Sequence, residues 1–269
     1  MFSLQAKHQY DHWTDRVGES FQRLSSGQIL RKDDPAGWAV ADKLRARSNG
    51  LEQAARNSLD GISLVQIADG TLGQTSEILQ RLRELAVQAA NGTLGEEDRA
   101  SLQSEFAGFR EEVDSLSRST DFNSLPLLDG NIDLLTLQVG DGTALHDVLS
   151  VDLENASSAH LGIDGLDIST AEGARDALDA IDGAIDSVNA SRGRQGAIQL
   201  SLENRVEALQ TESEKLQASA SRITDVDYAK ETAELTRSSI LQQASLAVFT
   251  QANLQPQIAL RLLDAALKV

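Results

Sequence analysis

Apolar residues recur at spacings of three and four along most of the chain, which is the periodicity of an α-helix with one apolar side. This spacing predicts an amphipathic helix over residues 4–24, and a last helix is predicted from about 226 to 265, weakened or kinked at Pro256. We expect the two terminal helices to pack through their apolar sides. The candidate packing residues are Tyr10, Trp13, Val17, Phe21, Leu24, Leu241, Val248 and Phe249.

Two long stretches repeat apolar residues every seven positions, which is typical of helices packed as coiled coils. The first lies within a predicted helix over about 35–90, in which Gly61 and Gly70 suggest breaks and Ser58 alone is polar on the lattice. A second helix is predicted to return over 96–118. Another heptad stretch covers 171–223, where Gln195 is the one polar member and SRGRQGA at 191–197 suggests a local rearrangement. The lattice residues are Leu51, Val65, Leu72, Leu79, Ala86, Ile181, Val188, Leu202, Leu209, Leu216 and Ile223.

Residues 119–170 differ from the helical stretches, because they alternate apolar and polar residues and are rich in turn formers. Leu135, Leu137 and Val139 alternate with polar residues before the turn sequence GDGT, and residues 148–153 can pair as a return strand. The pattern predicts one or two β-hairpins. The fold class is therefore mainly α: an elongated helical coiled coil formed by the N- and C-terminal helices, with a small β-hairpin region in the middle.

The segment RLSSGQILRKDDPAGWAVADKL at 23–44 has the composition of a catalytic loop, but its order is that of a joint between two helices. Gly27 suits the C-terminal stop of the first helix. Asp34 suits the N-cap of the next helix, and Pro35 suits its first position. We expect Gly27, Asp34 and Pro35 to form a hinge.

The formal net charge of −17 is unevenly distributed. Residues 1–44 hold six acidic and six basic residues, and residues 225–269 hold five and four. Of the 41 acidic and 24 basic residues, 30 and 14 therefore lie between these ends. Nearly neutral ends fit burial against protein, and an acidic middle fits solvent exposure. This charge argues against a nucleic-acid partner.

No enzyme signature stands out. There is no cysteine, which excludes disulfides and thiol catalysis, and no HExxH, GxSxG or phosphate-binding GxxxxGK pattern. His8, Asp11 and His12 could share a helix face, but two exposed histidines on an amphipathic helix explain them better than a metal site. We expect no catalytic site, cofactor or metal. No window is apolar enough to cross a membrane, and no secretory signal is visible.

The motifs at both ends resemble those of bacterial flagellins. RLSSG with KDDPAGWAVADKL, the run RNSLDGISLVQIADGTLGQTSEILQRLRELAVQAANGT at 56–93 and the stretch SRITDVDYAKETAELTRSSILQQASLAVFTQANLQPQIALRLL at 221–263 carry the likeness. LQVGDGTALHDVLSVDL is similar to the family's β-hairpin region. The resemblance implies a self-assembling, extracellular subunit of the flagellar filament, exported unfolded by the flagellar type III apparatus and lacking variable outer domains.

The resemblance also implies domains and partners. Residues 1–46 with 224–269 would form the inner coiled coil, and 47–223, including 119–170, would form the layer outside it. The partners implied are further copies of the chain, an export chaperone, the filament cap and junction proteins, and neither nucleic acid nor membrane. In flagellins recognised by the host Toll-like flagellin receptor, a helix of the QRLRELAVQ type carries contacts, and its positions here are Arg81, Leu85 and Gln88.

Two other readings stay open at this point. The hook–filament junction protein shares the family layout and differs in forming a short ring. A secreted, membrane-active helical protein is suggested by the uncharged run from Ser238 to Leu260, although the five glutamines of that run argue against it.

Overall fold

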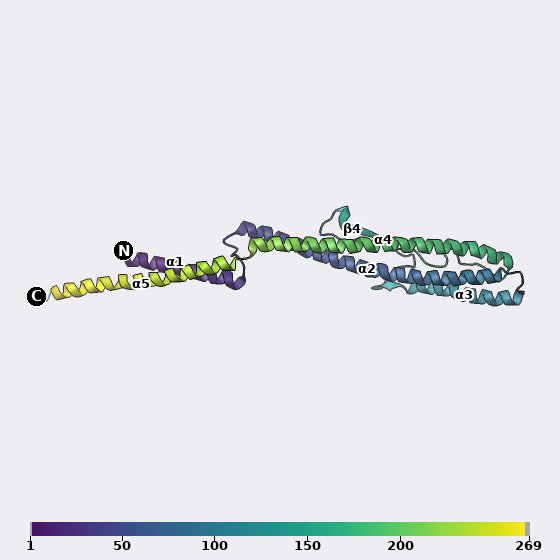
Figure 1. Cartoon of the computed structure of the whole chain (residues 1–269), viewed down its shortest axis with the longest axis horizontal. Helices are drawn as coiled ribbons and strands as arrows, with labels where there is room; N and C mark the ends of the chain where they lie inside the picture. The colour runs from purple at the N-terminus through teal and green to yellow at the C-terminus, as the bar shows by residue number, and fades with distance from the viewer. Residues whose placement is uncertain (1, 267–269) are drawn as a thin grey trace. The chain divides into compact units, whose positions relative to one another are not determined.

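The computed structural model describes residues 2–266, with side chains from residue 4 to residue 254. In this range the chain forms long helices and two small sheets (Figure 1). The helices are α1 (Phe2–Ser26), α2 (Pro35–Ala89), α3 (Glu96–Ser119), α4 (Ala171–Thr224) and α5 (Tyr228–Ala266), with a 3-10 turn η1 (Leu145–Asp147). The strands are β1 (Asp121–Phe122), β2 (Leu125–Pro126), β3 (Leu134–Gln138) and β4 (Val148–Asp152). The predicted mainly α fold is confirmed.

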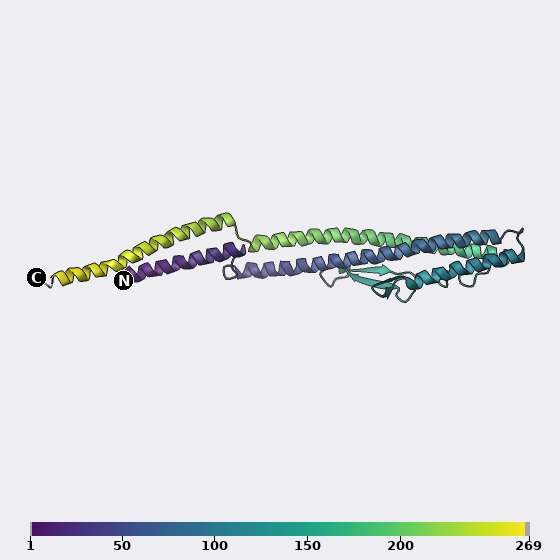
Figure 2. The same cartoon turned by 90° about the horizontal axis from the view of Figure 1, so that it is seen from below.

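The chain separates into two compact units, and each is described by itself. The terminal unit consists of Met1–Ala46 and Leu216–Val269, and the central unit is Arg47–Lys215. Helices α2 and α4 contribute residues to both units. In the terminal unit α1 and α5 run side by side in opposite directions in both views (Figures 1 and 2). The predicted pairing of the terminal helices is thereby confirmed.

The central unit is built on three helices, α2, α3 and α4, that lie alongside one another (Figure 2). The heptad residues that belong to this unit are buried, whereas Leu216 and Ile223 belong to the terminal unit and are half-buried. From the first heptad stretch, Leu51, Val65, Leu72, Leu79 and Ala86 are buried, and Ser58 is buried too, donating its hydroxyl proton to Ala54 O at 2.8 Å. That local bond satisfies the one polar member of the lattice, so the core tolerates it. Phe106 and Val113 of α3 complete the core with Ile181 and Val188 of α4.

The helix breaks predicted at Gly61 and Gly70 do not exist. Helix α2 continues through Gly61 and Gly70, and α4 continues through residues 191–197. Packing leaves no room for a side chain at Gly61, because a Cβ there would lie 2.5 Å from Cδ1 of Leu137 on β3. Within SRGRQGA, Ser191 and Gln195 point into the core, while Arg192 pairs with Asp69 and Arg194 with Glu154. The apparent interruption is therefore a place where α4 binds its neighbours through polar groups.

The β region forms two hairpins, as predicted. β1 and β2 pair around Asn123 and Ser124, both with positive φ, as a tight two-residue hairpin turn requires. β3 and β4 pair in antiparallel register from Leu134 opposite Asp152 to Gln138 opposite Val148. Arg205 of α4 donates to Val139 O at 3.0 Å and to His146 O, so it holds the connection between β3 and β4.

Candidate assembly surface

The residues that α1 and α5 bury most deeply are small or polar. Ser20 and Ser238 are almost completely buried, and Ala6 and Ser245 are buried as well. Small side chains allow two helix backbones to approach closely, but each removes little apolar surface from water. The pair is therefore close-fitting and weakly hydrophobic, and the Ser238 hydroxyl has no hydrogen-bond partner.

Several large apolar residues of the same helices are exposed. Phe21 is 61% exposed and Val248 is 60% exposed, and Leu4, Ile240, Leu246 and Leu254 are also exposed. Of the other predicted packing residues, Tyr10, Trp13, Val17, Leu24, Leu241 and Phe249 are half-buried. Exposed large apolar residues on these paired helices are candidates for a protein–protein contact surface.

Polar side chains tie α1 to α5 at several points. Gln242 donates to the Thr14 hydroxyl at 3.0 Å, and Arg16 lies 3.8 Å from Glu234. Closer to the joint, the Arg23 guanidinium donates to Glu231 at 3.1 Å. These polar pairs fix the register of α1 against α5. The small residues between the two helices specify that register only weakly.

The joint between α1 and α2 follows the predicted local chemistry. α1 ends at Ser26, and Gly27 has φ +69°, the left-handed conformation of a helix C-terminal stop. Asp34 Oδ1 accepts a hydrogen bond from Gly37 N at 2.8 Å, and Pro35 opens α2. The stop and the cap are confirmed, and their role as a hinge stays a prediction.

The joint also forms main-chain hydrogen bonds with the connection between α4 and α5. The sequence pattern did not predict this contact. Gln28 forms an antiparallel bridge with Asp225, Ile29 N donates to Thr224 O at 2.7 Å, and Val226 N donates to Gly27 O at 2.9 Å. These main-chain bonds leave no sequence pattern, because any residue except proline can make them.

Trp38 is the central side chain of this joint. It is buried, and its indole Nε1–H donates to Ile29 O at 3.0 Å. The guanidinium groups of Arg31 and Arg45 lie 4.6 and 5.4 Å from the ring centroid. This cation–π arrangement stabilises the first turns of α2 against the segment that precedes them.

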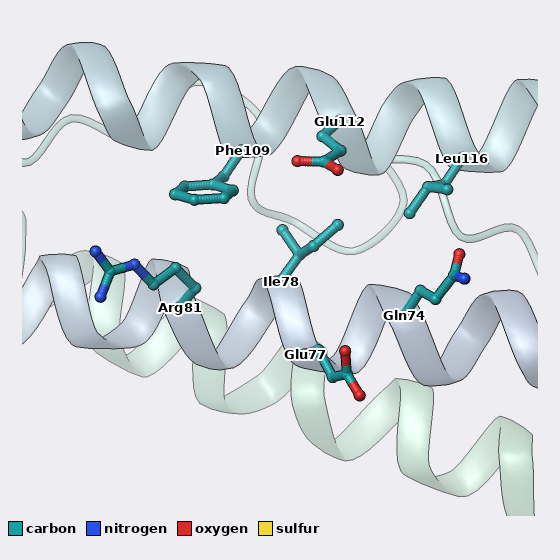
Figure 3. Close-up of a pocket in the computed structure, with 7 residues that line it drawn as sticks. All are labelled: Gln74, Glu77, Ile78, Arg81, Phe109, Glu112 and Leu116. Atoms are coloured by element: carbon teal, nitrogen blue, oxygen red, sulfur yellow. The ribbon is translucent and has the colours of Figure 1, made fainter.

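A groove runs between α2 and α3 in the central unit (Figure 3). It has a volume of about 370 Å³. Ile78 points from α2 towards α3, and Phe109 and Leu116 point from α3 towards α2. The charged residues Glu77, Arg81 and Glu112 also line the groove, so it combines an apolar floor with a polar rim.

The three predicted receptor-contact residues have different surroundings. Arg81 is exposed and pairs with Glu84 at 2.8 Å and with Glu105 at 3.0 Å. These two hydrogen bonds raise the pKa of Arg81. Gln88 is exposed, whereas Leu85 is only 1% exposed and belongs to the core. In this conformation Arg81 and Gln88 can reach a partner directly, and Leu85 supports the helix from beneath.

The described residues form neither a metal-binding cluster nor a membrane-spanning helix. His8 and His12 are exposed on α1, and no group of three potential metal-binding side chains occurs in this part of the chain. Among the same residues, no helix has a stretch that is both long and apolar enough to span a bilayer.

Comparisons with known proteins identify the helical regions at both ends of the chain. The model of the bacterial flagellin N-terminal helical region matches residues 1–133, and that of the C-terminal helical region matches residues 178–263. A flagellin of Halalkalibacterium halodurans is 45% identical over 249 residues, covering 91% of both chains. A flagellin of Bacillus subtilis is 39% identical, covering 91% of this chain and 92% of its own.

Solved structures give the same result. The crystal structure of Bacillus cereus flagellin superimposes with a TM-score of 0.52 at 28% identity, covering 57% of this chain and 88% of that one. A putative flagellar hook-associated protein from Vibrio parahaemolyticus has a TM-score of 0.61 at 18% identity, covering 72% and 100%, and shares the fold. The curated relatives favour a flagellin over a junction protein. The chain belongs to the bacterial flagellin family.

Proposed function

We propose that this structural subunit of the flagellar filament assembles by burying the large apolar residues that α1 and α5 expose. The observation that carries the proposal is that small residues are the most buried ones in the α1–α5 pair, whereas Phe21 and Val248 are exposed. Fully burying such a side chain contributes about 1.5–3 kcal/mol. Each subunit contributes several of them, so contacts between copies stabilise the polymer strongly.

In this proposal the residues 1–46 and 224–269 form the inner coiled coil of the filament, and the acidic region 47–223 forms the layer outside it. Gly27, Asp34 and Pro35 are then the hinge between the two. The support is the charge distribution, since residues 1–44 and 225–269 are nearly neutral and the stretch between them holds 30 acidic against 14 basic residues. Charged groups are costly to bury without partners, so the neutral ends suit the interior of a polymer.

The localisation and further partners are part of the same proposal. The subunit is exported through the flagellar type III apparatus and ends in the extracellular filament, where cap and junction proteins contact it. The uncharged run Ser238–Leu260 supports a role for an export chaperone, because an apolar surface of this kind needs cover before assembly.

A contact with the host Toll-like flagellin receptor is proposed for the exposed face of α2. Arg81 and Gln88 would make direct contacts, and Leu85 would hold the helix in place from the core. A receptor reporter assay with purified monomer tests this proposal. The proposal is supported if the monomer activates the receptor and if Arg81→Ala and Gln88→Ala each reduce this activation. It is refuted if saturating protein does not activate the receptor.

The assembly proposal is tested with Phe21→Ser and Val248→Ser, singly and together. Both side chains are exposed in the free chain, so we expect the free energy of unfolding of the monomer to change by no more than about 0.5 kcal/mol. Filament formation, followed by light scattering and negative-stain microscopy, should be strongly reduced.

Leu145→Ser is the matched control, because Leu145 is an exposed apolar residue of the central unit, 96% exposed in η1. This variant should polymerise as the unmodified protein does. Normal filaments from the double variant Phe21→Ser/Val248→Ser would show that the outward apolar residues do not drive assembly.

A further inference from the structure

The chain contains two Asn-Gly dipeptides, Asn49–Gly50 and Asn91–Gly92, in contrasting structural settings. An asparagine followed by glycine can lose its side-chain amide without an enzyme. The main-chain nitrogen of the glycine attacks Cγ of the asparagine, the side-chain nitrogen leaves as ammonia, and a five-membered succinimide forms. Water then opens the ring to give aspartate or isoaspartate. Glycine favours the attack because it has no Cβ to obstruct it.

Asn91 is exposed and lies between α2 and α3, outside regular secondary structure. Figure 1 shows the turn that joins these two helices. Among the hydrogen bonds of the described residues, none uses the N–H of Gly92, so the attacking nitrogen is not held elsewhere. Thr93 N donates to Asn91 Oδ1 at 3.2 Å, and this bond draws electron density from Cγ. The turn therefore has a free nucleophile next to a polarised amide.

Asn49 and its glycine lie inside α2, where each main-chain N–H is bonded to the carbonyl one turn earlier. Gly50 is also packed, because a Cβ added there would lie 3.2 Å from Cβ of Asp141. Succinimide formation at this position requires the helix to open first, so only the small open population can react. The same dipeptide is thus protected at one position and accessible at the other.

We propose that Asn91 is a site of spontaneous amide-to-acid conversion in the folded protein and that Asn49 is not. Water is the only co-reactant, and ammonia is the only product released. This inference rests on the turn alone and does not depend on the proposed assembly mechanism.

Conversion of Asn91 would alter the end of α2. A new carboxylate would face the negative end of the helix dipole, which is unfavourable. Arg99 now anchors the turn by donating to Ala89 O and to Asn91 O, both at 2.9 Å. Isoaspartate lengthens the main chain by one carbon at this point, which displaces the Asn91 carbonyl from Arg99. Subunits that remain in place for a long time would accumulate a loosened, more acidic turn.

The test compares both dipeptides within one sample. The purified chain is incubated under mildly alkaline conditions, and peptide mass mapping measures the acid fraction at positions 49 and 91, while enzymatic methylation detects isoaspartate. In the folded protein we expect Asn91 to convert at least about tenfold faster than Asn49. In concentrated urea the two rates should become similar, because both dipeptides are then unprotected.

Gly92→Ala is the matched variant, because Gly92 does not have a positive φ and an added Cβ would meet no atom within 4 Å. The variant should keep its unfolding temperature and slow conversion at position 91 without changing position 49. Equal rates at both positions in the folded chain would overturn the proposal. So would an Asn91 that stays intact in the folded chain yet converts in urea, or a Gly92→Ala variant that converts as fast as the unmodified protein.

Discussion

The guanidinium of Arg23 on α1 lies 3.1 Å from the carboxylate of Glu231 on α5, although the two residues are 208 positions apart in the sequence. Both side chains are largely shielded from solvent, with exposed fractions of 17% and 11%. Arg23 also donates to Asp33 in the joint at 2.8 Å. Burial acts to lower the pKa of Arg23, but the hydrogen bonds to Asp33 and Glu231 outweigh it and raise the pKa. One guanidinium therefore joins α1, α5 and the end of the joint.

Replacing Arg23 by alanine should open the terminal unit. The change leaves the buried Glu231 carboxylate without its cation, at a cost of about 1–3 kcal/mol. Hydrogen–deuterium exchange should show faster exchange in α1 and at the start of α5, with unchanged protection in the central unit. Arg16→Ala is the control: Arg16 lies 3.8 Å from Glu234 and is exposed, so its loss should cost less than about 0.5 kcal/mol. Equal effects of the two variants would contradict the special role of Arg23.

Two glycine-to-alanine substitutions should have opposite effects. At Gly27, which has φ +69°, alanine should destabilise the end of α1 by about 1–2 kcal/mol, because the left-handed conformation is costly for a residue with a Cβ. At Gly70, in the exposed middle of α2 with no atom within 4 Å of an added Cβ, alanine should stabilise by about 0.5–1 kcal/mol.

Exchange protection in each unit and thermal unfolding measure these changes. If Gly70→Ala destabilised the protein, that result would indicate that α2 is interrupted at Gly70 in solution and would contradict the continuous helix. A neutral Gly27→Ala would mean that the stop is not under conformational constraint.

Local chemistry explains what could be predicted from the sequence. The stop at Gly27 and the cap at Asp34 depend on residues within a few positions of each other, so their spacing alone identifies them. The heptad positions were also correct, because the period of a helix decides which residues share a side. The contact from Arg23 to Glu231 depends on how two distant helices align, and no local pattern records that alignment.

The helix breaks expected at Gly61 and Gly70 were wrong for a related reason. Glycine lowers helix propensity by about 1 kcal/mol, but tertiary packing overrides a penalty of that size. At Gly61 the close approach of Leu137 and Leu202 favours the absence of a side chain. Similarly, the spacing of three and four shows that Phe21 shares a side with Trp13 and Leu24, but not which surface covers that side.

The ion pair between Arg83 and Asp182 should make the central unit weakly sensitive to acid. The Arg83 Nε–H donates to Asp182 Oδ1 at 2.6 Å, and this hydrogen bond lowers the pKa of Asp182. A carboxyl group whose pKa is lower in the folded state stabilises the fold above its unfolded pKa of about 3.9, and this contribution disappears as the pH falls through the folded pKa.

Asp182→Asn should therefore lower the unfolding temperature slightly at neutral pH and should match the unmodified protein in strong acid. Thermal unfolding followed by circular dichroism over a pH series measures the difference. Asp186→Asn is the control on the same helix, because Asp186 is exposed and has no ion pair among the described residues. A difference from the unmodified protein that persists at the lowest pH would exclude the ion pair as its cause.

Gln195 links the heptad core of α4 to the end of β4. Its side chain is 1% exposed, and Nε2 donates to Asp152 O at 2.9 Å, while Oε1 has no partner. Gln195→Leu would complete the apolar lattice and remove an unsatisfied oxygen, but it would also release the Asp152 carbonyl. The gain in apolar burial and the lost hydrogen bond are each about 1 kcal/mol, so the net free energy of unfolding should change little.

The local effect should be larger than the global one. Amide exchange in β4 should accelerate while the heptad positions of α4 keep their protection, because only the contact to the strand has been lost. Gln195→Glu provides the opposing case, since it places a carboxylate beside the Asp152 carbonyl in the core and should destabilise the whole central unit near neutral pH. If Gln195→Leu instead left β4 exchange unchanged, the polar position in the heptad would have no role in holding the hairpin.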